Sequence, residues 1–360
     1  MQPQFLIEPP SELHRLCETL GIELPSINGA RLDAQRFRSH FDAAVFGLTS
    51  EDTSIVVFGS LARDEFTDGS DVDWTLLVDG VADPKHLDLA RQVKGILKSM
   101  EAKEPGQEGV FGNLAFSHDI VHQIGGEDDS NSNTTKRILL ILESHPIGRR
   151  DSFDRVLSHV LNRYIGEDPR FLQPDARFQV PRFLLNDFAR YWRTMAVDFA
   201  HKRRTRGGTG MAIRNIKLRM SRKLIFVSGL LGCFSVHLLL PDEEKAAVLA
   251  ADNPSQEFVR HLRHVFAQTP LEILAGVVNR HNHLGPLGKK LFSAYDEFLG
   301  ALRDPSKRAH LDSLAPGAAE GDPLFQELRA RSHEFRDALL ELFFDEKTGL
   351  AQLTRTYGVF

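Results

Sequence analysis

Apolar and polar positions follow two different rhythms along this chain, and the change falls near residue 150. Before it, short apolar runs of strand length alternate with segments of helical period. The runs at 54–58, 73–78 and 114–124 are predicted as strands. Asn133 or Thr134 is the expected N-cap of an apolar helix. The helices predicted in this half cover 11–20, 33–47, 60–64, 83–100 and 136–144.

Beyond residue 150 the strand signals largely vanish. Helices are predicted over 152–164, 182–203, 209–231, 255–267, 286–302 and 323–344. Segment 304–322, which contains several Pro and Gly residues, is expected to be the longest loop. The pattern predicts an α+β fold, a small mixed sheet with helices followed by an all-α domain. Its expected parts are 1–150, then 151–344 with a basic helix at 209–231, and a tail at 345–360.

Composition places the chain among ordinary soluble proteins. The 360 residues are 42% hydrophobic and 26% charged, and the net charge of −5 gives no global field that attracts nucleic acid. The two cysteines, Cys17 and Cys233, lie in apolar, helix-like stretches and are expected to be buried free thiols in a reducing cytoplasm. The N-terminus lacks the pattern of a signal peptide. The apolar run at 224–240 is short for a membrane span and predicts a buried core helix.

The richest local pattern is a Gly-Ser turn followed by an Asp-x-Asp pair. Gly59 and Ser60 end an apolar run, and Asp71 and Asp73 open the next one about ten residues later. Alternate residues of a strand share a face, so the two carboxylates project together and repel each other unless a cation lies between them. Mg2+ prefers such oxygen ligands, and a Gly-Ser turn can present N–H groups to a phosphate. The competing interpretation is a hairpin edge with solvated aspartates.

This combination resembles the signature of the DNA polymerase β-like nucleotidyltransferase superfamily, over roughly residues 50–125. The resemblance implies a polymerase β-like core in which two Mg2+ ions, or Mn2+, promote attack on the α-phosphate of a (d)NTP. It also implies a third carboxylate from a later strand. Asp119 is the candidate, as general base or metal ligand, and the alternatives are Asp129 or no third carboxylate.

Several residues are expected to contact the triphosphate. Gly59 and Ser60 would hold its β and γ phosphates, although Ser60 also suits a simple N-cap. Arg63 could reach the same phosphates or pair with a neighbouring acid. Between residues 200 and 240 there are nine Lys and Arg residues and no Asp or Glu, which favours phosphate contacts from Arg214 and Lys217 over a merely solvated helix face. The basic segment 203–210 is expected to be a mobile loop.

A finer resemblance involves the segment 118–144 and the tail. The former is similar to bacterial nucleotidyltransferases related to the GlnD uridylyltransferase. With its length and tail tyrosine, Tyr357, the chain resembles the nucleotidyltransferase component of Hailong anti-phage defence. That resemblance implies template-independent synthesis of short single-stranded DNA from dATP, priming by Tyr357, an oligonucleotide product and control of a membrane effector protein. From the residues alone, Tyr357 fits packing better than priming.

Other functions compatible with the motif remain open. The chain could transfer a nucleotide to a protein or tRNA, as uridylyltransferases and toxins do, or it could make a cyclic or oligonucleotide second messenger. A catalytically inactive binding module belongs to a different class. The intact Asp-x-Asp pair argues against that class, and a metal-dependent turnover assay separates it from the others.

Overall fold

A four-stranded sheet with the order β3–β2–β1–β4 forms the centre of the N-terminal half. The structure is a computed structural model that describes residues 10–105, 114–173, 176, 179–205, 210–315 and 317–358. β1 pairs antiparallel with β2 and β4, and β2 pairs parallel with β3. The strands are β1 (Thr53–Phe58), β2 (Trp74–Val78), β3 (Leu114–Phe116) and β4 (Ser144–Ile147).

Helices cover both faces of this sheet. In β1, Ile55 and Val57 join a small core with α2 and α4, whereas Val56 and Phe58 join a large core that continues into α6 and α7. Because both faces are buried, β1 is apolar at every position from Ile55 to Phe58. The helices of this half are α1 (Glu12–Leu20), α2 (Pro25–Ala44), α3 (Gly59–Ala62), α4 (Lys85–Ser99), α5 (Ser117–His122), α6 (Asn131–Leu142) and α7 (Asp151–Glu167).

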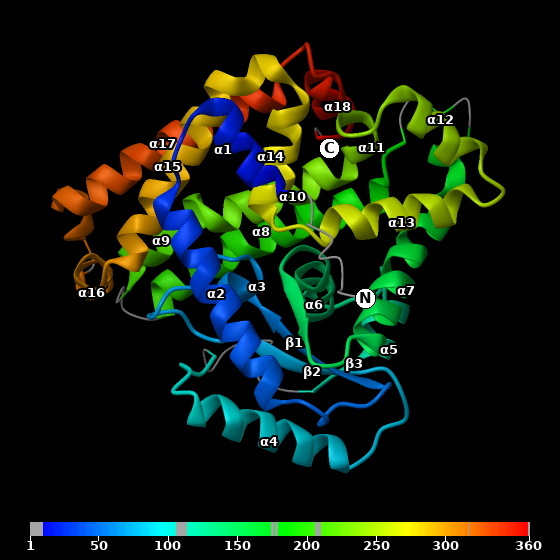
Figure 1. The fold of residues 1–360 in the computed structure, drawn as a ribbon, viewed down its shortest axis with the longest axis horizontal. Coiled ribbons are helices and arrows are strands. Elements are labelled where there is room, and N and C mark those ends of the chain that lie inside the picture. Colours follow the sequence, from blue (N-terminus) through cyan, green and yellow to red (C-terminus); the bar gives the residue numbers. More distant parts are fainter. Residues whose placement is uncertain are drawn as a thin grey trace, which may run out of the picture.

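The rest of the described chain is helical and gathers on the side of the sheet away from α4 (Figure 1). Its helices share the large core with α6 and α7. They are η1 (Pro169–Leu172), α8 (Arg182–Thr205), α9 (Met211–Arg219), α10 (Ser221–Cys233), α11 (Ser235–Leu238), α12 (Asp242–Ala250), α13 (Pro254–Phe266), α14 (Pro270–Arg280), η2 (Asn282–Leu284), α15 (Gly285–Arg303), α16 (Pro305–Ser313), η3 (Ala319–Gly321), α17 (Pro323–Phe343) and α18 (Leu350–Tyr357).

The α+β prediction is confirmed, since a small mixed sheet precedes a helical region. The division into domains at residue 150 stays a prediction. The apolar run at 224–240 is confirmed as buried helix in α10 and α11, and no helix of the described chain is long and apolar enough to cross a membrane. Cys233 is buried and Cys17 only partly so, and both thiols are free.

The expected strand at 114–124 is wrong in its second half. β3 ends at Phe116, and α5 follows at once. Ile120 and Val121 are buried in the large core while His118 and Asp119 are exposed, which is a helical and not an alternating pattern. Short apolar runs do not separate strand from helix by period alone, so the error is of a known kind.

Other elements also differ from the prediction. α6 begins a turn earlier than expected, because Ser130 caps it by accepting a hydrogen bond from the Asn133 N–H at 3.2 Å. The helix expected over 209–231 breaks into α9 and α10 at Met220, which has φ −107° and ψ −91°. Segment 304–322 contains α16 and η3 and is not a loop. The strand β4 was not anticipated.

Candidate active site

Gly59 begins the turn that joins β1 to α3. Its φ of +68° lies in the left-handed region, where a Cβ is unfavourable. A Cβ there would also come within 3.1 Å of Oδ2 of Asp73, so glycine permits both the turn and the close approach of the carboxylate. The turn and the Asp-x-Asp segment, ten residues apart in the sequence, are therefore in direct contact.

Asp71 and Asp73 are held in an extended segment between two backbone neighbours. The Phe58 N–H donates to the Asp73 carbonyl at 2.9 Å, and the Val72 N–H donates to the Lys103 carbonyl at 2.9 Å. Val72 is buried, so the flanking side chains point the other way, as their spacing predicts. Both carboxylates line one cavity.

The electrostatic surroundings of Asp73 are unfavourable to its charge. Burial, Glu143 and Asp71 together raise the pKa of the Asp73 carboxyl to about 7. Arg222 and Arg63 offset only part of this effect. A metal-free Asp73 is therefore partly protonated near neutral pH, and a bound cation would favour its ionised form.

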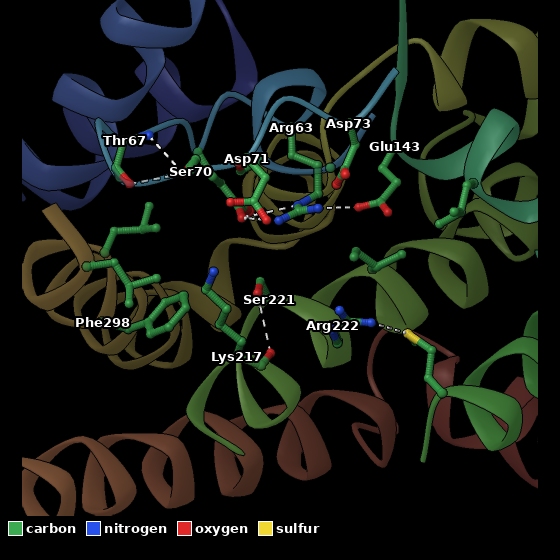
Figure 2. Close-up of a pocket in the computed structure, with 18 of the residues that line it drawn as sticks. Arg63, Thr67, Ser70, Asp71, Asp73, Glu143, Lys217, Ser221, Arg222 and Phe298 are labelled. Carbon is green, nitrogen blue, oxygen red and sulfur yellow. Dashed lines mark hydrogen bonds and ion pairs between the residues drawn. The ribbon is translucent and has the colours of Figure 1, made fainter. Parts of the chain in front are cut away.

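The cavity has a volume of about 330 Å³ and lies between the sheet and the helices α8, α9, α10, α15 and α16. Figure 2 shows the carboxylates on one wall and Lys217 and Arg222 facing them from another. Its polar lining comprises Gly59, Ser60, Arg63, Glu65, Thr67, Ser70, Asp71, Asp73, Thr135, Glu143, Tyr191, Thr194, Asp198, Lys217, Ser221, Arg222 and Arg308. Its apolar lining comprises Leu139, Met195, Ile225, Phe298, Leu299 and Leu302.

Arg63 occupies the floor of the cavity and pairs with two acids. Its guanidinium bonds Glu65 at 2.8 Å and also pairs with Glu143. Burial alone would lower the pKa of Arg63, but Glu65 and Glu143 outweigh it and raise that pKa. The Tyr295 hydroxyl donates to Glu65 at 2.8 Å, so α15 fixes the network from the helical region. Arg63 was expected either to reach the phosphates or to pair with a neighbouring acid. In the structure it pairs with the acid Glu65, and it also lines the cavity.

Three cations form the opposite wall of the cavity. Burial, Arg308 and Arg222 lower the pKa of Lys217 to about 8, which Asp71 partly offsets. In the described chain the Lys217 ammonium has no hydrogen bond or ion pair, so it is available to an anion. Arg308 instead holds the loop before Asp71, because it donates to the Thr67 hydroxyl at 2.8 Å and to the Gly69 carbonyl.

The structure places Asp119 away from the aspartate pair, contrary to expectation. In the parallel pair of β2 and β3, Val78 lies opposite Phe116, so Asp119 follows the carboxyl end of β2. Asp73 immediately precedes the amino end of that strand, roughly 16 Å away along a strand of five residues. Asp119 is exposed and does not line the cavity. It cannot complete the site without a rearrangement.

Asp129, the alternative third carboxylate, is also elsewhere. It is buried against Arg137 at 2.9 Å and Arg190 at 3.0 Å, where it ties α6 to α8. Glu143 is the acid that the sequence analysis missed. Glu143 follows α6 and precedes Ser144. Because Ser144 pairs with Phe58, the residue before Gly59, Glu143 is brought close to the Gly-Ser turn. An acid directly after a long apolar run was the available signal.

The remaining expected residues divide into two groups. Gly59, Ser60, Arg63 and Lys217 line the cavity with the aspartates. Arg214, on the same helix as Lys217, is not among the lining residues. Tyr357 ends α18, is half-buried, and packs against the large core outside the cavity lining. In the expected basic loop, residues 206–209 lie outside the described residues.

The donor set fits a divalent ion only in part. The described ranges contain no group of three or more His, Cys, Asp or Glu side chains placed to hold a metal. Asp71 and Asp73 are two carboxylates on one face, and Mg2+ commonly uses one or two protein carboxylates together with water and substrate phosphates. Glu143 is engaged by Arg63. The pair alone therefore suits a metal that arrives with its substrate.

Comparison with protein families explains this arrangement. Residues 45–105 match the family model described as a nucleotidyltransferase domain, and the matched range includes the Gly-Ser turn and both aspartates. No curated protein and no solved structure matches the chain. Domains of this type generally use divalent metal ions. Residues 45–105 therefore form a nucleotidyltransferase domain, and the chain is an enzyme of the nucleotidyltransferase type.

Proposed function

We propose that this enzyme transfers the nucleotidyl group of a nucleoside triphosphate to a hydroxyl acceptor in the cavity that holds Asp71 and Asp73. The same-face carboxylate pair, opposite a wall of cations, carries this proposal. In-line attack forms a bond from the acceptor oxygen to the α-phosphorus and breaks the bond to the β-phosphate oxygen. Pyrophosphate leaves, and the acceptor loses its proton.

In this proposal, the residues on the different sides of the cavity have different roles. Gly59 and Ser60 bind the β and γ phosphates through the turn. Lys217 and Arg222 neutralise the negative charge of the leaving pyrophosphate, since both face the carboxylates across the cavity. Arg63 can exchange one of its two acids for a phosphate. The apolar lining offers surface for the base and sugar.

Asp71 and Asp73 would hold the divalent ions, Mg2+ or Mn2+, and Glu143 would join them if its pairing with Arg63 opens. Bound there, such ions neutralise phosphate charge and lower the pKa of an attacking hydroxyl. The protein's own contribution is to fix the carboxylates, through Gly59 and Arg308, before substrate arrives. The raised pKa of the Asp73 carboxyl indicates that added positive charge would be favourable at this site.

As a finer proposal, the donor is dATP and the product a short single-stranded DNA that begins on the Tyr357 oxygen. The sequence resemblance to the Hailong nucleotidyltransferase supports this version. The same resemblance supports a role for the product in controlling a membrane effector during anti-phage defence. Tyr357 would have to leave its packing on α18 to reach the cavity. Arg214 would then contact phosphates of the growing strand.

The test is incubation of the full chain with each of the common ribo- and deoxyribonucleoside triphosphates, with Mg2+ or Mn2+. Pyrophosphate release, gel electrophoresis and intact mass together separate a nucleotide-modified protein, an extended oligomer and a free cyclic product. Asp73→Asn should abolish release, whereas Asp88→Asn, a matched change on the exposed surface of α4, should not. Absence of pyrophosphate release with every triphosphate and both metals contradicts the proposal.

A further inference from the structure

A second basic surface lies on α17, outside the cavity. Arg329, His333, Arg336, Leu340 and Phe344 follow one another at intervals of three or four residues, which places them along one side of the helix and its C-cap. Leu340 is 52% exposed and Phe344 50% exposed, although both are large and apolar. The stripe therefore presents two arginines at one end and exposed apolar side chains at the other, with His333 between the arginines.

Two further cations extend this stripe from the neighbouring helices. α17 packs against α9, and the Arg219 guanidinium lies 3.4 Å from Nε2 of His333. Arg219 also donates to the Asn215 side chain at 2.7 Å. Lys223 lies one turn further, at the start of α10. In the part of the chain that the structure describes, neither Arg219 nor Lys223 forms an ion pair with a carboxylate.

Like charges crowd each other on this surface. Burial, Arg219 and Arg336 lower the pKa of Lys223, and burial, Arg329 and Arg336 lower that of Arg219. Two of the nearby acids pair with arginines of this surface: Glu320 with Arg329 at 2.5 Å, and Asp337 with Arg336 at 2.7 Å. Arg219 and Lys223 therefore keep positive charge without a carboxylate partner in the described chain, and a bound polyanion would relieve their mutual repulsion.

The surface is continuous along the chain with the cavity wall. Lys217 and Arg222 enter the cavity from α9 and α10 (Figure 2). Arg219 and Lys223, their near neighbours in sequence, instead lie beside residues of α17, since Arg219 contacts His333 and Arg336 lowers the pKa of Lys223. A chain of phosphates that leaves the cavity would meet cations on both sides of the junction between α9 and α10.

We propose that Arg219, Lys223, Arg329, His333, Arg336, Leu340 and Phe344, called here the α17 track, bind single-stranded nucleic acid. Lys223 and the three arginines would contact backbone phosphates, and the exposed Phe344 ring would stack on a base. This inference rests on the proposed function, because it names the class of acceptor or product that the cavity would serve.

The shape of the α17 track favours a strand over a lipid surface. Exposed acids, Glu334, Asp337 and Glu341, flank it on the same helix. A planar anionic membrane would bring its charge against these acids, whereas a single strand can follow the cations between them. The apolar part consists of Leu340 and Phe344, since the other large apolar side chains near them on α17 are buried.

The test is fluorescence anisotropy of a labelled single-stranded oligodeoxynucleotide of mixed sequence, about 20 nucleotides long to span several phosphate contacts, with the full chain. Paired Lys223→Gln and Arg336→Gln should weaken binding about tenfold at low salt and flatten its salt dependence. Phe344→Ser should weaken binding about tenfold at every salt concentration, because stacking is not screened. Arg260→Gln, a change of an exposed arginine on α13, should leave binding unchanged.

Two results would overturn the inference: oligonucleotide binding that the three track substitutions leave unaltered, or binding to phosphatidylserine vesicles without binding to the oligonucleotide. Melting temperatures of all variants exclude unfolding as the cause of weaker binding. Pyrophosphate release without oligonucleotide, measured in parallel, tests the proposed function separately. If the enzyme releases pyrophosphate but the track substitutions leave oligonucleotide binding unaltered, only the inference about the α17 track is refuted. If those substitutions weaken binding but no triphosphate yields pyrophosphate, only the proposed function is refuted.

Discussion

Arg308 on α16 donates a hydrogen bond to the Thr67 hydroxyl at 2.8 Å across 241 residues of sequence. The same guanidinium bonds the Gly69 carbonyl, and a Cβ on Gly69 would lie only 2.5 Å from Nε of Arg308. The Thr67 hydroxyl in turn lies 3.0 Å from that of Ser70, the residue before Asp71. A helix near the end of the chain thus holds the loop that presents the first aspartate.

Replacing Arg308 should therefore impair turnover by misplacing Asp71. We expect Arg308→Ala to lower kcat roughly a hundredfold, the size of effect that a displacement of about 1 Å can cause. Arg308→Lys should recover little, because one ammonium cannot reach both acceptors in the same geometry. Lys307→Ala, on the exposed side of α16, is the control. Steady-state kinetics that show a change only in KM would mean that Arg308 binds substrate and does not position the loop.

The metal-free protein should become more stable when Asp73 loses its charge. Its pKa is raised from 3.8 to about 7, so the folded state binds the proton more tightly than the unfolded state. Stability due to this group is present below pH 4 and declines as pH rises toward 7. Asp73→Asn should thus raise the melting temperature by a few degrees at pH 8 without metal, and change it little at pH 4. A lower melting temperature at pH 8 would contradict this account.

Residues 53–78 show how much of the site the sequence could predict. The alternation that puts Asp71 and Asp73 on one face and the need for Gly59 in the turn are local properties, and both appear in the structure. Arg308 and Tyr295 could not be found in this way, because only the folded chain brings Arg308 to the loop before Asp71 and Tyr295 to Glu65. Local patterns carry no information on contacts between distant segments.

Asp119 shows the limit of periodicity. The sequence pattern predicted one long strand over 114–124. The structure has a strand of only three residues, followed by the helix α5, whose buried residues pack in the large core. As a result, Asp119 is exposed and lies beyond the carboxyl end of β2, whereas Asp73 precedes the amino end of that strand. Long helices with a clear apolar side, such as α13 and α15, were easier to predict, although the break at Met220 leaves no mark in the pattern.

Glu143 and Asp119 offer a matched test of the third carboxylate. Glu143→Gln keeps the size of the side chain but removes its charge beside Asp73 and Arg63. We expect at least a tenfold loss of kcat, as for other groups that assist proton transfer or hold metal, about 10²-fold being typical. Asp119→Asn should keep near-normal kcat, since Asp119 is exposed and distant. The reverse ranking, measured at saturating metal and triphosphate, would restore Asp119 to the site.

Triphosphate affinity should depend on the charge of Lys217. Its pKa of about 8 means that the free enzyme loses this positive charge as pH rises through 8, whereas an ordinary lysine keeps it to about 10.4. KM for the triphosphate should therefore rise roughly fivefold to tenfold between pH 7 and pH 9. Lys217→Arg stays protonated, so its KM should not rise over that range. Identical pH profiles for the two proteins would exclude Lys217 as the titrating group.

Tyr357 allows a decisive test of tail priming. The residue ends α18 and packs half-buried on the core, so its hydroxyl must move before it can attack an α-phosphate. Tyr357→Phe keeps the ring but removes the attacking oxygen, and we expect the variant to remain folded. If the tail primes synthesis, intact mass should show a nucleotide adduct on the parent and none on the variant.

The same variant separates priming from extension. A supplied oligonucleotide with a free 3′-hydroxyl should restore pyrophosphate release by Tyr357→Phe, because the cavity with Asp71, Asp73 and Lys217 is unchanged. Asp73→Asn should not be rescued by the same oligonucleotide, since it lacks the site that both reactions need. Equal initiation by Tyr357→Phe and the parent without added primer would show that the tail is a packing element, and that the first acceptor is another hydroxyl.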